Sequence, residues 1–511
     1  MRHAYQVAAI RTAERALMDR LPPGTLMRRA AAGLASACTS LLARDPGYVY
    51  GARVLVLAGT GDNGGDALYA AALLARRGAA VTAIMAAPKA HEGGTAELTG
   101  AGGRVLDGAR GGIALAAAFG GADLIIDGLL GIGGRGGLRE PFAGLARQAD
   151  QVDATVVAVD LPSGIDPDTG AVEGPAVRAD VTVTFGAIKP GLLIDPGARH
   201  AGAVDLVDIG LGPYLESPPS ALAPQSGDIA GLLPRPGPES DKYRRGVLGL
   251  LAGSDRFAGA AVLATGGAVR GGAGMVRVVT GEVPAAAVRQ AWPEAVLTVH
   301  PDAAGADLIG SVGRVQAWAA GPGMGTGPDA AARLAAVLGT DLPVLVDADG
   351  LTILSQVQGL LPRAAPTLIT PHAGELARLL GTDGPSVEAR RLEHARRAAA
   401  ELGVTVLLKG STTVIAPPGG DEPVLVNPTG TSWLATAGTG DVLSGLAGSL
   451  LAQGLSPAMA GLAAAYLHGL AARLAADPGT RRGQDGSWAR GEAPIGASDV
   501  VRALPAAFRS L

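Results

Sequence analysis

The chain has 511 residues, of which 48% are apolar and 17% charged, a balance typical of folded domains and not of a disordered chain. This length exceeds what one hydrophobic core supports, so two or three domains are expected. A net charge of −4 excludes the basic footprint of a nucleic-acid-binding protein. The arginine pairs Arg28-Arg29 and Arg390-Arg391 are therefore interpreted as solvated helix faces.

Cysteine usage and hydropathy indicate a cytoplasmic protein. The single cysteine, Cys38, lies in an Ala-rich run, cannot form an internal disulfide, and is expected to be a buried small residue and not a nucleophile. The first 20 residues carry charges every few positions and lack the apolar core of a signal peptide. No stretch of about 18 apolar residues is free of charge or dense glycine, so no membrane span is expected.

The first half of the chain alternates helical segments with short apolar runs. Residues 4–44 have apolar residues at helical spacing, with a break at Pro22-Pro23-Gly24. The runs that follow are near-continuously apolar and separated by helices, which is typical of strands in a parallel sheet covered on both faces. We expect these strands within 52–59, 79–86, 122–131, 154–164 and 179–186.

A second alternation follows a break in the pattern. Residues 210–227 are rich in Pro and Ser and lack periodicity, so we predict a domain at 1–215, a linker at 216–227 and a second domain at 228–511. The two halves share no repeat, which predicts different folds. In the second half we expect strands within 245–254, 274–281, 315–325, 343–351, 366–376 and 404–417, and a helix at 460–476.

The first strand of the chain ends in a glycine-rich loop that leads into a helix. Gly59, Gly61 and Gly64 match the dinucleotide-binding fingerprint in its usual context. That fingerprint also needs an acidic residue about 20 positions later, for the ribose, and the next strand ends without one. A plain dinucleotide oxidoreductase is therefore disfavoured. A phosphate-binding loop remains, in which Asp62 and Asn63 are close polar neighbours.

Two further strand ends in the first half carry oxygen ligands. Asp127 precedes a second glycine-rich loop, and Asp160 lies three residues before Ser163. Ligands of an open parallel sheet bind beyond the carboxyl ends of the strands, where these residues and Asn63 are all expected. Each acid taken alone is well explained as a helix cap or turn residue. Taken together, the four predict a site for a hard cation.

Three segments closely resemble the NAD(P)H-hydrate epimerase domain of the YjeF N-terminal type, over about residues 1–215. They are GTGDNGGDALYAA, IIDGLLGIGGRGGLREP and VDLPSGIDPDTG. The resemblance implies a Rossmann-like fold, potassium bound by Asn63, Asp127 and Ser163, and Asp160 as the acid/base, with Lys189 nearby. Asp62 replaces the family's usual asparagine and Ile132 its usual threonine. The implied substrate contacts are Asp62, Asn63, Gly64, Gly65, Asp66, Gly131, Ile132, Gly133, Gly134, Arg135, Gly136, Gly137 and Asp160.

The second half contains the tetrapeptide Gly438-Thr439-Gly440-Asp441, directly followed by an apolar helical pattern. A glycine-rich turn at a helix N-terminus presents free N–H groups and the positive end of the helix dipole to an anion. An aspartate on the first turn can take a proton from a group that attacks this anion. The tetrapeptide therefore predicts a site for a phosphate and a hydroxyl together.

Other strand ends of the second half add charged residues, for each of which a structural role is also open. Asp347, in VDADGL, could cap the following helix. His372, in TPHAGE, could be a satisfied turn histidine. Lys409, in LLKGSTT, could be an ordinary solvated lysine.

The strings KYRRG, AGPGMG, VDADGL, TPHAGE and GTGD together resemble the ADP/ATP-dependent NAD(P)H-hydrate dehydratase family of the ribokinase-like superfamily, over about residues 228–511. The resemblance implies removal of water from the hydrate, with ADP or ATP as phosphoryl donor, Mg²⁺ on the diphosphate and Asp441 as the base. The implied hydrate contacts are Ala260, Gly323, His372 and Asp441. The implied nucleotide contacts are Lys409, Gly410, Ser411, Thr412, Thr413, Gly438, Thr439 and Gly440.

The sequence thus predicts an α/β protein with an N-terminal Rossmann-like and a C-terminal ribokinase-like α/β/α domain. The expected function is bifunctional repair: epimerisation of the R and S forms of NADH hydrate and NADPH hydrate (NADHX and NADPHX), and ADP-dependent dehydration of the S form. We expect a homo-oligomer with no nucleic-acid or membrane partner. Two alternatives are a ribokinase-like small-molecule kinase fused to a nucleotide-binding module, and a first half that only senses a ligand.

Overall fold

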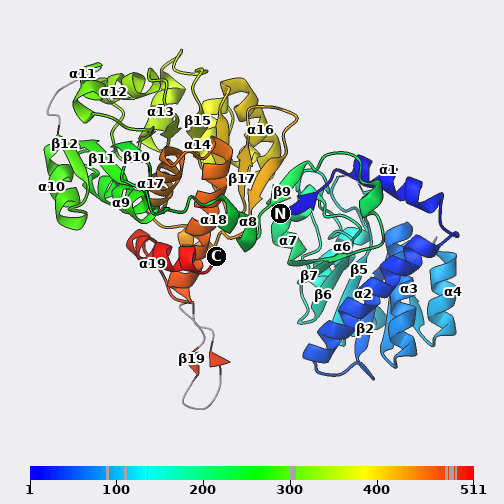
Figure 1. The fold of residues 1–511 in the computed structure, drawn as a ribbon. Coiled ribbons are helices and arrows are strands. Elements are labelled where there is room, and N and C mark those ends of the chain that lie inside the picture. The colour runs from blue at the N-terminus through cyan, green and yellow to red at the C-terminus, as the bar shows by residue number, and fades with distance from the viewer. Residues whose placement is uncertain are drawn as a thin grey trace. The chain divides into compact units, whose positions relative to one another are not determined.

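The computed structural model describes residues 1–87, 91–108, 112–134, 136–299, 306–477, 481–482, 488–489 and 492–511. The chain forms two compact units, coloured from blue to green and from green to red in Figure 1. The first is Arg2–Ala221, and the second is Leu222–Leu511 together with Met1. In the range expected to be a linker, the structure has strand β9 (Ala221–Ala223) and the start of helix α8 (Ser226–Leu232).

The N-terminal unit is built on a parallel sheet of order β4-β3-β2-β5-β6-β7-β8. All five strands expected from apolar runs are present. The edge strands β4 and β8 were not predicted, because most of their residues are exposed or half-buried and form no continuous apolar run. The strands of this sheet are β2 (Arg53–Ala58), β3 (Ala80–Met85), β4 (Arg104–Asp107), β5 (Leu124–Gly128), β6 (Thr155–Val159), β7 (Val181–Phe185) and β8 (Ala203–Val207), and strand β1 (Arg2–Ala4) lies outside it.

Alternate residues of the central strand β2 belong to two hydrophobic cores, one on each face of the sheet. Val54 and Val56 pack in the core that includes residues of α2 and α3, whereas Leu55 and Leu57 pack in the core that includes residues of α5 and α6. The result is the three-layer arrangement expected from sequence. The helices are α1 (Val7–Met18), α2 (Thr25–Arg44), α3 (Asp62–Arg76), α4 (Glu92–Gly100), α5 (Ile113–Gly120), α6 (Phe142–Ala149) and α7 (Ala198–Ala201).

The C-terminal unit contains a larger mixed sheet of order β9-β18-β17-β16-β15-β14-β13-β10-β11-β12. Strands β10 to β16 pair in parallel, and β17 pairs antiparallel with both β16 and β18. The single apolar run 404–417 is therefore two strands. The strands are β10 (Val247–Leu251), β11 (Met275–Thr280), β12 (Val296–Val299), β13 (Ala317–Ala320), β14 (Val344–Val346), β15 (Thr367–Ile369), β16 (Thr405–Leu408), β17 (Thr413–Ala416) and β18 (Val424–Asn427), with a separate pair β19 (Arg481–Arg482) and β20 (Trp488–Ala489).

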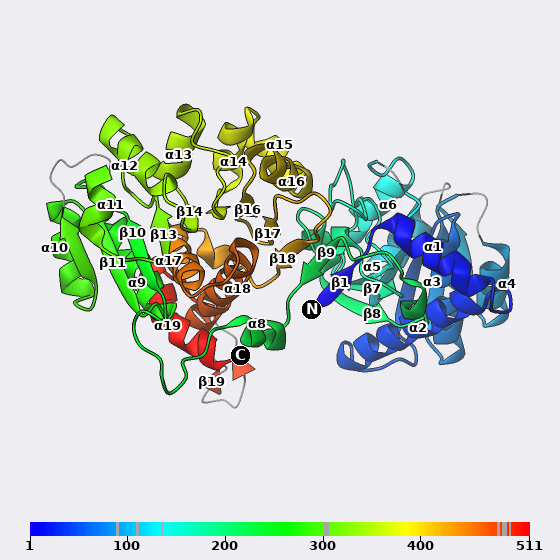
Figure 2. The ribbon, with the colours of Figure 1, turned by 45° about the horizontal axis from the view of Figure 1, so that its top comes forward.

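Helices α9, α17, α18 and α19 share one core with this sheet, and Figure 2 shows α12 to α16 arranged along its other face. Helix α18 is long and apolar enough to cross a membrane by length and composition, but 67% of that apolar stretch is buried within the molecule, as in the core helix of a soluble protein. The remaining helices are α9 (Ala258–Arg270), α10 (Glu282–Ala291), α11 (Ala306–Val312), α12 (Pro328–Leu338), α13 (Asp349–Gln356), α14 (Ala373–Leu380), α15 (Gly384–Ala389), α16 (Arg391–Leu402), α17 (Thr439–Ala452), α18 (Pro457–Ala476) and α19 (Ala497–Arg509).

Candidate active sites

The glycine-rich loop after β2 lies at the carboxyl edge of the N-terminal sheet and leads directly into α3. Gly59 packs so closely on the next strand end that a Cβ there would lie 1.9 Å from the carbonyl oxygen of Leu129. Gly64 is equally constrained, because its Cβ would lie 2.4 Å from the Gly59 carbonyl oxygen. Since β5 and β6 follow β2 in the sheet, the loop lies beside Asp127 and the segment after β6.

Asn63, Asp127 and Ser163 meet at this edge. Asn63 Nδ2 donates to the carbonyl oxygens of Leu130, at 3.1 Å, and Val159, at 2.8 Å. Ser163 Oγ donates to Asp127 Oδ1 at 2.7 Å, and the Ser163 N–H donates to Asp127 Oδ2 at 2.8 Å. Asp127 is fully buried, and burial raises its pKa to about 6.

This donor set is one carboxylate surrounded by neutral amide, hydroxyl and carbonyl oxygens, which suits a hard cation of low charge. Among the residues that the structure describes, no group of three or more His, Cys, Asp or Glu side chains could hold a metal ion. An oxygen-only donor set of this kind is chemically suited to an alkali cation such as potassium.

Asp160 has different partners from the other three oxygen ligands. Its Oδ1 accepts hydrogen bonds from Lys189 Nζ, from Thr184 Oγ1 at 3.1 Å and from the Phe185 N–H at 3.1 Å. The Lys189 side chain is only 1% exposed. Asp160 also has a φ of 64°, a left-handed conformation that is strained for a residue other than glycine and is often found at functional sites. The structure thus groups Asp160 with Lys189 as a buried ion pair.

Asp66 is a half-buried acid beside this pair. Burial raises its pKa well above the usual value, and the charges of Asp160 and Asp62 raise it further. Its Oδ1 is buried and has no hydrogen-bond partner within the described part of the chain. Burial and the neighbouring carboxylates thus favour the protonated form of Asp66.

Helix α1 contributes residues to the site that the sequence did not point to. Arg11 Nη2 donates to the Ile132 carbonyl oxygen at 3.2 Å, which ties α1 to the second glycine-rich loop. The pKa of Glu14 is raised, chiefly by burial, in a field that includes the charges of Lys189 and Asp160. No motif marks these residues, because their proximity depends on how α1 packs. Arg135, expected in the same loop, lies outside the described residues.

In the C-terminal unit the tetrapeptide 438–441 forms the start of α17, as the pattern predicted. Gly438 has a φ of 87° and is the residue before the helix. Asp441 lies in the first turn, and its pKa is raised to about 7 by burial and by the charge of Asp347, against the opposing effect of Lys409. A carboxylate with this pKa is matched to proton abstraction near neutral pH.

Asp347, which is buried, and Lys409, which is half-buried, form an ion pair beside Asp441. Lys409 Nζ lies 2.8 Å from Asp347 Oδ1, and Ser444 Oγ donates to Asp347 Oδ2 at 2.6 Å. Burial lowers the pKa of Lys409, but the charges of Asp347 and Glu375 outweigh it and the pKa is raised. The two structural interpretations from sequence are thus wrong. Asp347 does not cap α13, because the N-cap of that helix is Ala348. Lys409 is not an ordinary solvated lysine. Ser444 was not predicted, although it lies on the same helix face as Asp441.

His372 caps helix α14. Its ring Nδ1 accepts the Gly374 N–H at 3.0 Å, and the His372 backbone N–H donates to Glu375 Oε2 at 2.8 Å. The turn interpretation therefore holds for Nδ1. The ring remains 59% exposed, with Nε2 3.6 Å from Glu375 Oε1, so the outer edge of the ring is free to meet a ligand.

The turn around Gly323 lies against the start of α9. A Cβ on Gly323, which has a φ of 60°, would lie 2.7 Å from the Cβ of Ala260 and 2.8 Å from that of Phe257. The Gly325 N–H donates to Asp349 Oδ2 at 2.9 Å and connects this turn to the segment that holds Asp347. The structure therefore brings two predicted hydrate contacts, Ala260 and Gly323, into direct proximity.

The interpretation of Arg390-Arg391 as a solvated pair is wrong for one member. Arg390 is 56% exposed at its side chain, but Arg391 is 1% exposed and donates from Nη2 to the Lys409 carbonyl oxygen at 2.8 Å. The burial of Arg391 could not be predicted from sequence, because neighbouring residues at a helix start point in different directions. The predicted nucleotide loop, Lys409–Thr413, thus has a buried arginine against its first residues.

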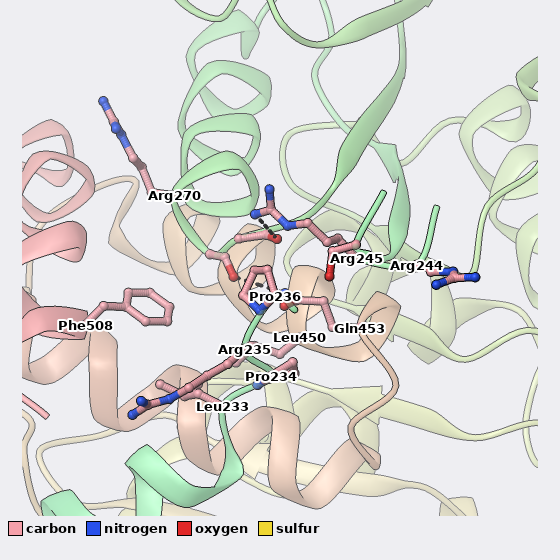
Figure 3. Close-up of a pocket in the computed structure, with 13 residues that line it drawn as sticks. Leu233, Pro234, Arg235, Pro236, Arg244, Arg245, Arg270, Leu450, Gln453 and Phe508 are labelled. Atoms are coloured by element: carbon pink, nitrogen blue, oxygen red, sulfur yellow. Dashed lines mark hydrogen bonds between the residues drawn. The ribbon is translucent and has the colours of Figure 1, made fainter. Parts of the chain in front are cut away.

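A cavity of about 250 Å³ lies at another place in the C-terminal unit, where the 233–240 segment meets the C-terminal ends of α9 and α17. Figure 3 shows its labelled arginines pointing in different directions around Pro236. Arg245 donates to the Gly272 carbonyl oxygen at 3.0 Å and Arg270 lies over the Trp292 ring. The cavity contains none of the predicted site residues.

Two protein families match this chain, one in each of its two units. The family described as YjeF-related protein N-terminus matches residues 23–191, and the family described as NAD(P)H-hydrate dehydratase matches residues 248–485. The fold and the two sites define a two-domain α/β enzyme with one polar site at each sheet edge.

Relatives match both halves together. A protein of Mycobacterium leprae named bifunctional NAD(P)H-hydrate repair enzyme Nnr is 48% identical over 515 residues, covering 100% of both chains. One of the same name from Mycobacterium tuberculosis is 49% identical over 457 residues, covering 89% of this chain and 90% of that protein. The chain belongs to the family of bifunctional NAD(P)H-hydrate repair enzymes.

A solved structure resembles the C-terminal half. It is an ADP/ATP-dependent NAD(P)H-hydrate dehydratase from Bacillus subtilis, co-crystallized with ATP and Mg²⁺. The identity is 32% with a TM-score of 0.49, and the match covers 56% of this chain and 97% of that one.

Proposed function

We propose that the two units catalyse consecutive repair steps, each at its own sheet edge. The N-terminal unit epimerises the R and S hydrates of NADH and NADPH at Asp160 and Lys189, and the C-terminal unit dehydrates the S form at Asp441. The observation that carries the proposal is Asp441 itself: a half-buried carboxylate with a pKa of about 7, in the first turn of α17 beside free N–H groups.

Dehydration needs a better leaving group than hydroxide, and a phosphoryl donor supplies one. Asp441 removes the proton of the 6-hydroxyl group as its oxygen attacks the terminal phosphorus of ADP, and AMP leaves. The N–H groups of the 438–440 turn stabilise the charge on the transferring group. The ring-nitrogen lone pair then expels phosphate from C6, and loss of a proton from C5 restores the double bond of NADH.

The adenine nucleotide lies along Lys409–Thr413 and the 431–440 segment in this proposal, and the hydrate contacts Ala260, Gly323 and His372. Mg²⁺ fits the nucleotide and not a preformed protein cage, because Asp347 is engaged by Lys409 and Ser444. Mg²⁺ is commonly held by substrate phosphates and water. When bound, it neutralises the charge of the diphosphate.

Epimerisation inverts a carbon that carries both a hydroxyl group and the ring nitrogen. We place a ring opening at Asp160: the carboxylate takes the hydroxyl proton while the N1–C6 bond breaks to give an aldehyde, and Lys189 supplies a proton to N1. Rotation and closure on the opposite face return both protons. The buried ion pair of Asp160 and Lys189 supports this assignment, because a proton can move in either direction between such partners.

Potassium is assigned to Asn63, Asp127 and Ser163, with the substrate against 62–66 and 131–137. When bound, it supplies positive charge beside the phosphates of the substrate. We further propose a cytoplasmic homo-oligomer whose partners are small molecules, consistent with the reduced, buried Cys38.

The test is recovery of absorbance at the reduced-nicotinamide band when racemic NADH hydrate is mixed with the protein, ADP and Mg²⁺. Recovery beyond the S fraction supports both activities. A phosphorylated product that accumulates without free phosphate would instead indicate a kinase, and no recovery with ADP or ATP would refute the dehydratase assignment.

A further inference from the structure

Two arginines from two different helices hold the backbone at the predicted nucleotide site. We propose that Arg391 of α16 and Arg473 of α18 are positioning residues for the adenine nucleotide. They fix the main chain of the Lys409–Thr413 loop and of the segment that begins at Thr429. The inference rests on the proposed function, which places the nucleotide along these two segments.

Arg391 is bonded to the end of β16. Its Nη2 donates to the carbonyl oxygens of Lys409, at 2.8 Å, and Leu408, at 3.3 Å, while Nη1 donates to Glu388 at 2.7 Å. The side chain is 1% exposed, and its Nε has no hydrogen-bond partner in the described part of the molecule. Burying an unpaired donor costs free energy, so a simple packing role would be better served by an apolar residue.

Arg473 bonds in the same way to the segment after β18. Its Nε donates to the Thr429 carbonyl oxygen at 2.7 Å, and its Nη2 donates to that of Gly430 at 2.8 Å. Two donors of a planar guanidinium on consecutive carbonyls set direction as well as distance, which the single ammonium of lysine cannot do. Unlike Arg391, Arg473 is exposed, so its substitution leaves the core intact.

The two held segments touch at Gly430, and Gly410 packs directly on Arg391. A Cβ on Gly410 would lie 2.2 Å from Arg391 Nη2, and a Cβ on Gly430 would lie 2.3 Å from the Ser411 carbonyl oxygen. Neither glycine has room for a side chain. Displacement of either arginine therefore shifts both segments, because their backbones are packed together.

The held segments lead to the reacting groups. Lys409, whose carbonyl Arg391 fixes, reaches Asp347 with its ammonium group. The segment held by Arg473 continues to Thr439 at the start of α17. There a second α18 residue, the buried His468, lies close to the Thr439 backbone. Helix α18 thus contacts both ends of the 429–439 segment, which places its main chain relative to the phosphoryl group.

Arg391→Lys and Arg473→Lys test the proposal in the full chain, with ADP and purified S hydrate as the varied substrates. We expect KM for ADP to rise about ten-fold in each variant, the effect of losing one hydrogen bond from a charged donor. KM for the hydrate should stay within about two-fold, because its contacts lie on other elements. Arg397→Lys is the matched control: it lies on α16, and its partner is the exposed Glu401.

The readout separates positioning from stability. A partly unfolded variant lowers the active fraction, and hence kcat, without changing KM for ADP. Unchanged KM for ADP in both variants would overturn the proposal, whatever happens to kcat. If the Arg391→Lys variant does not fold, KM for ADP in the Arg473→Lys variant tests the proposal by itself. Failure of the proposed function is a different result, because the unsubstituted chain would then show no ADP-dependent recovery.

Discussion

Both sites contain a lysine–aspartate ion pair at the carboxyl edge of a parallel sheet, but the pair has a different position in each. In the N-terminal unit Asp160 bonds directly to Lys189 and is itself the proposed acid/base. In the C-terminal unit Lys409 bonds to Asp347, and a separate carboxylate beside them, Asp441, has a raised pKa.

The difference matches the chemistry of the two steps. A reversible inversion needs a group that gives and takes protons equally well, which a directly paired acid and cation supply. An irreversible phosphoryl transfer needs a base that is not neutralised by its own salt bridge. The charges of Asp347 and Lys409 act on the pKa of Asp441 in opposite directions. Because Lys409 is bonded to Asp347, Asp441 stays available to accept a proton.

The largest expected effect is on the unpaired carboxylate. Asp441→Asn should lower the dehydratase rate about a thousand-fold, within the range that a general base contributes, while the epimerase rate on the same chain is unchanged. The measurement is NADH formed from the S hydrate and ADP. A loss of less than about ten-fold would show that another group takes the proton.

Asp160→Asn should lower interconversion of the two hydrates about a hundred-fold, because one member of the acid/base pair is removed. Chromatographic separation of R and S hydrate measures the rate. Dehydration of added S hydrate serves as the control and should not change. Retained hydrate binding with lost epimerisation rules out a purely sensing role, and a normal rate would contradict the assignment of Asp160.

The pH profile distinguishes the two sites further. Asp441 acts as a base only when ionised, so kcat/KM of the dehydratase should fall about ten-fold per pH unit below about pH 7. Burial raises the pKa of Asp441 most, the Asp347 and Asp349 carboxylates raise it further, and Lys409 lowers it. A limb centred near pH 4, the range of an ordinary aspartate, would contradict the burial argument.

The smallest effect concerns potassium. Replacing K⁺ by tetramethylammonium should slow epimerisation about five-fold, equivalent to roughly 1 kcal/mol, and leave dehydration unchanged. In Ser163→Ala the rate should be low in both salts, since one of the three oxygen ligands is missing. Equal potassium dependence of both activities would place the cation elsewhere.

Much of the fold was predictable because buried parallel strands are near-continuous apolar runs, and the topology brings their carboxyl ends together. The same reasoning located Asp127 and Asp160, whereas Asp441 was located from the glycine-rich turn that begins a helical pattern. It missed β4 and β8, whose edge positions leave them without apolar continuity.

Partners distant in sequence were not predictable. Lys409 pairs with Asp347 across 62 positions, and only the order of β14, β15 and β16 brings them together. Arg391 was misjudged for a related reason: a charged residue at a helix start is usually solvated, and its burial depends on the loop packed against it.

The central claim is that one chain has two separable sites, and a mixing experiment tests it most directly. Racemic NADH hydrate, ADP and Mg²⁺ would be supplied to an equimolar mixture of Asp160→Asn and Asp441→Asn chains. Absorbance recovery should pass the S fraction and approach completion, because each variant retains the step that the other lacks. Recovery that stops at the S fraction in the mixture, but not with the unsubstituted chain, would contradict two independent sites.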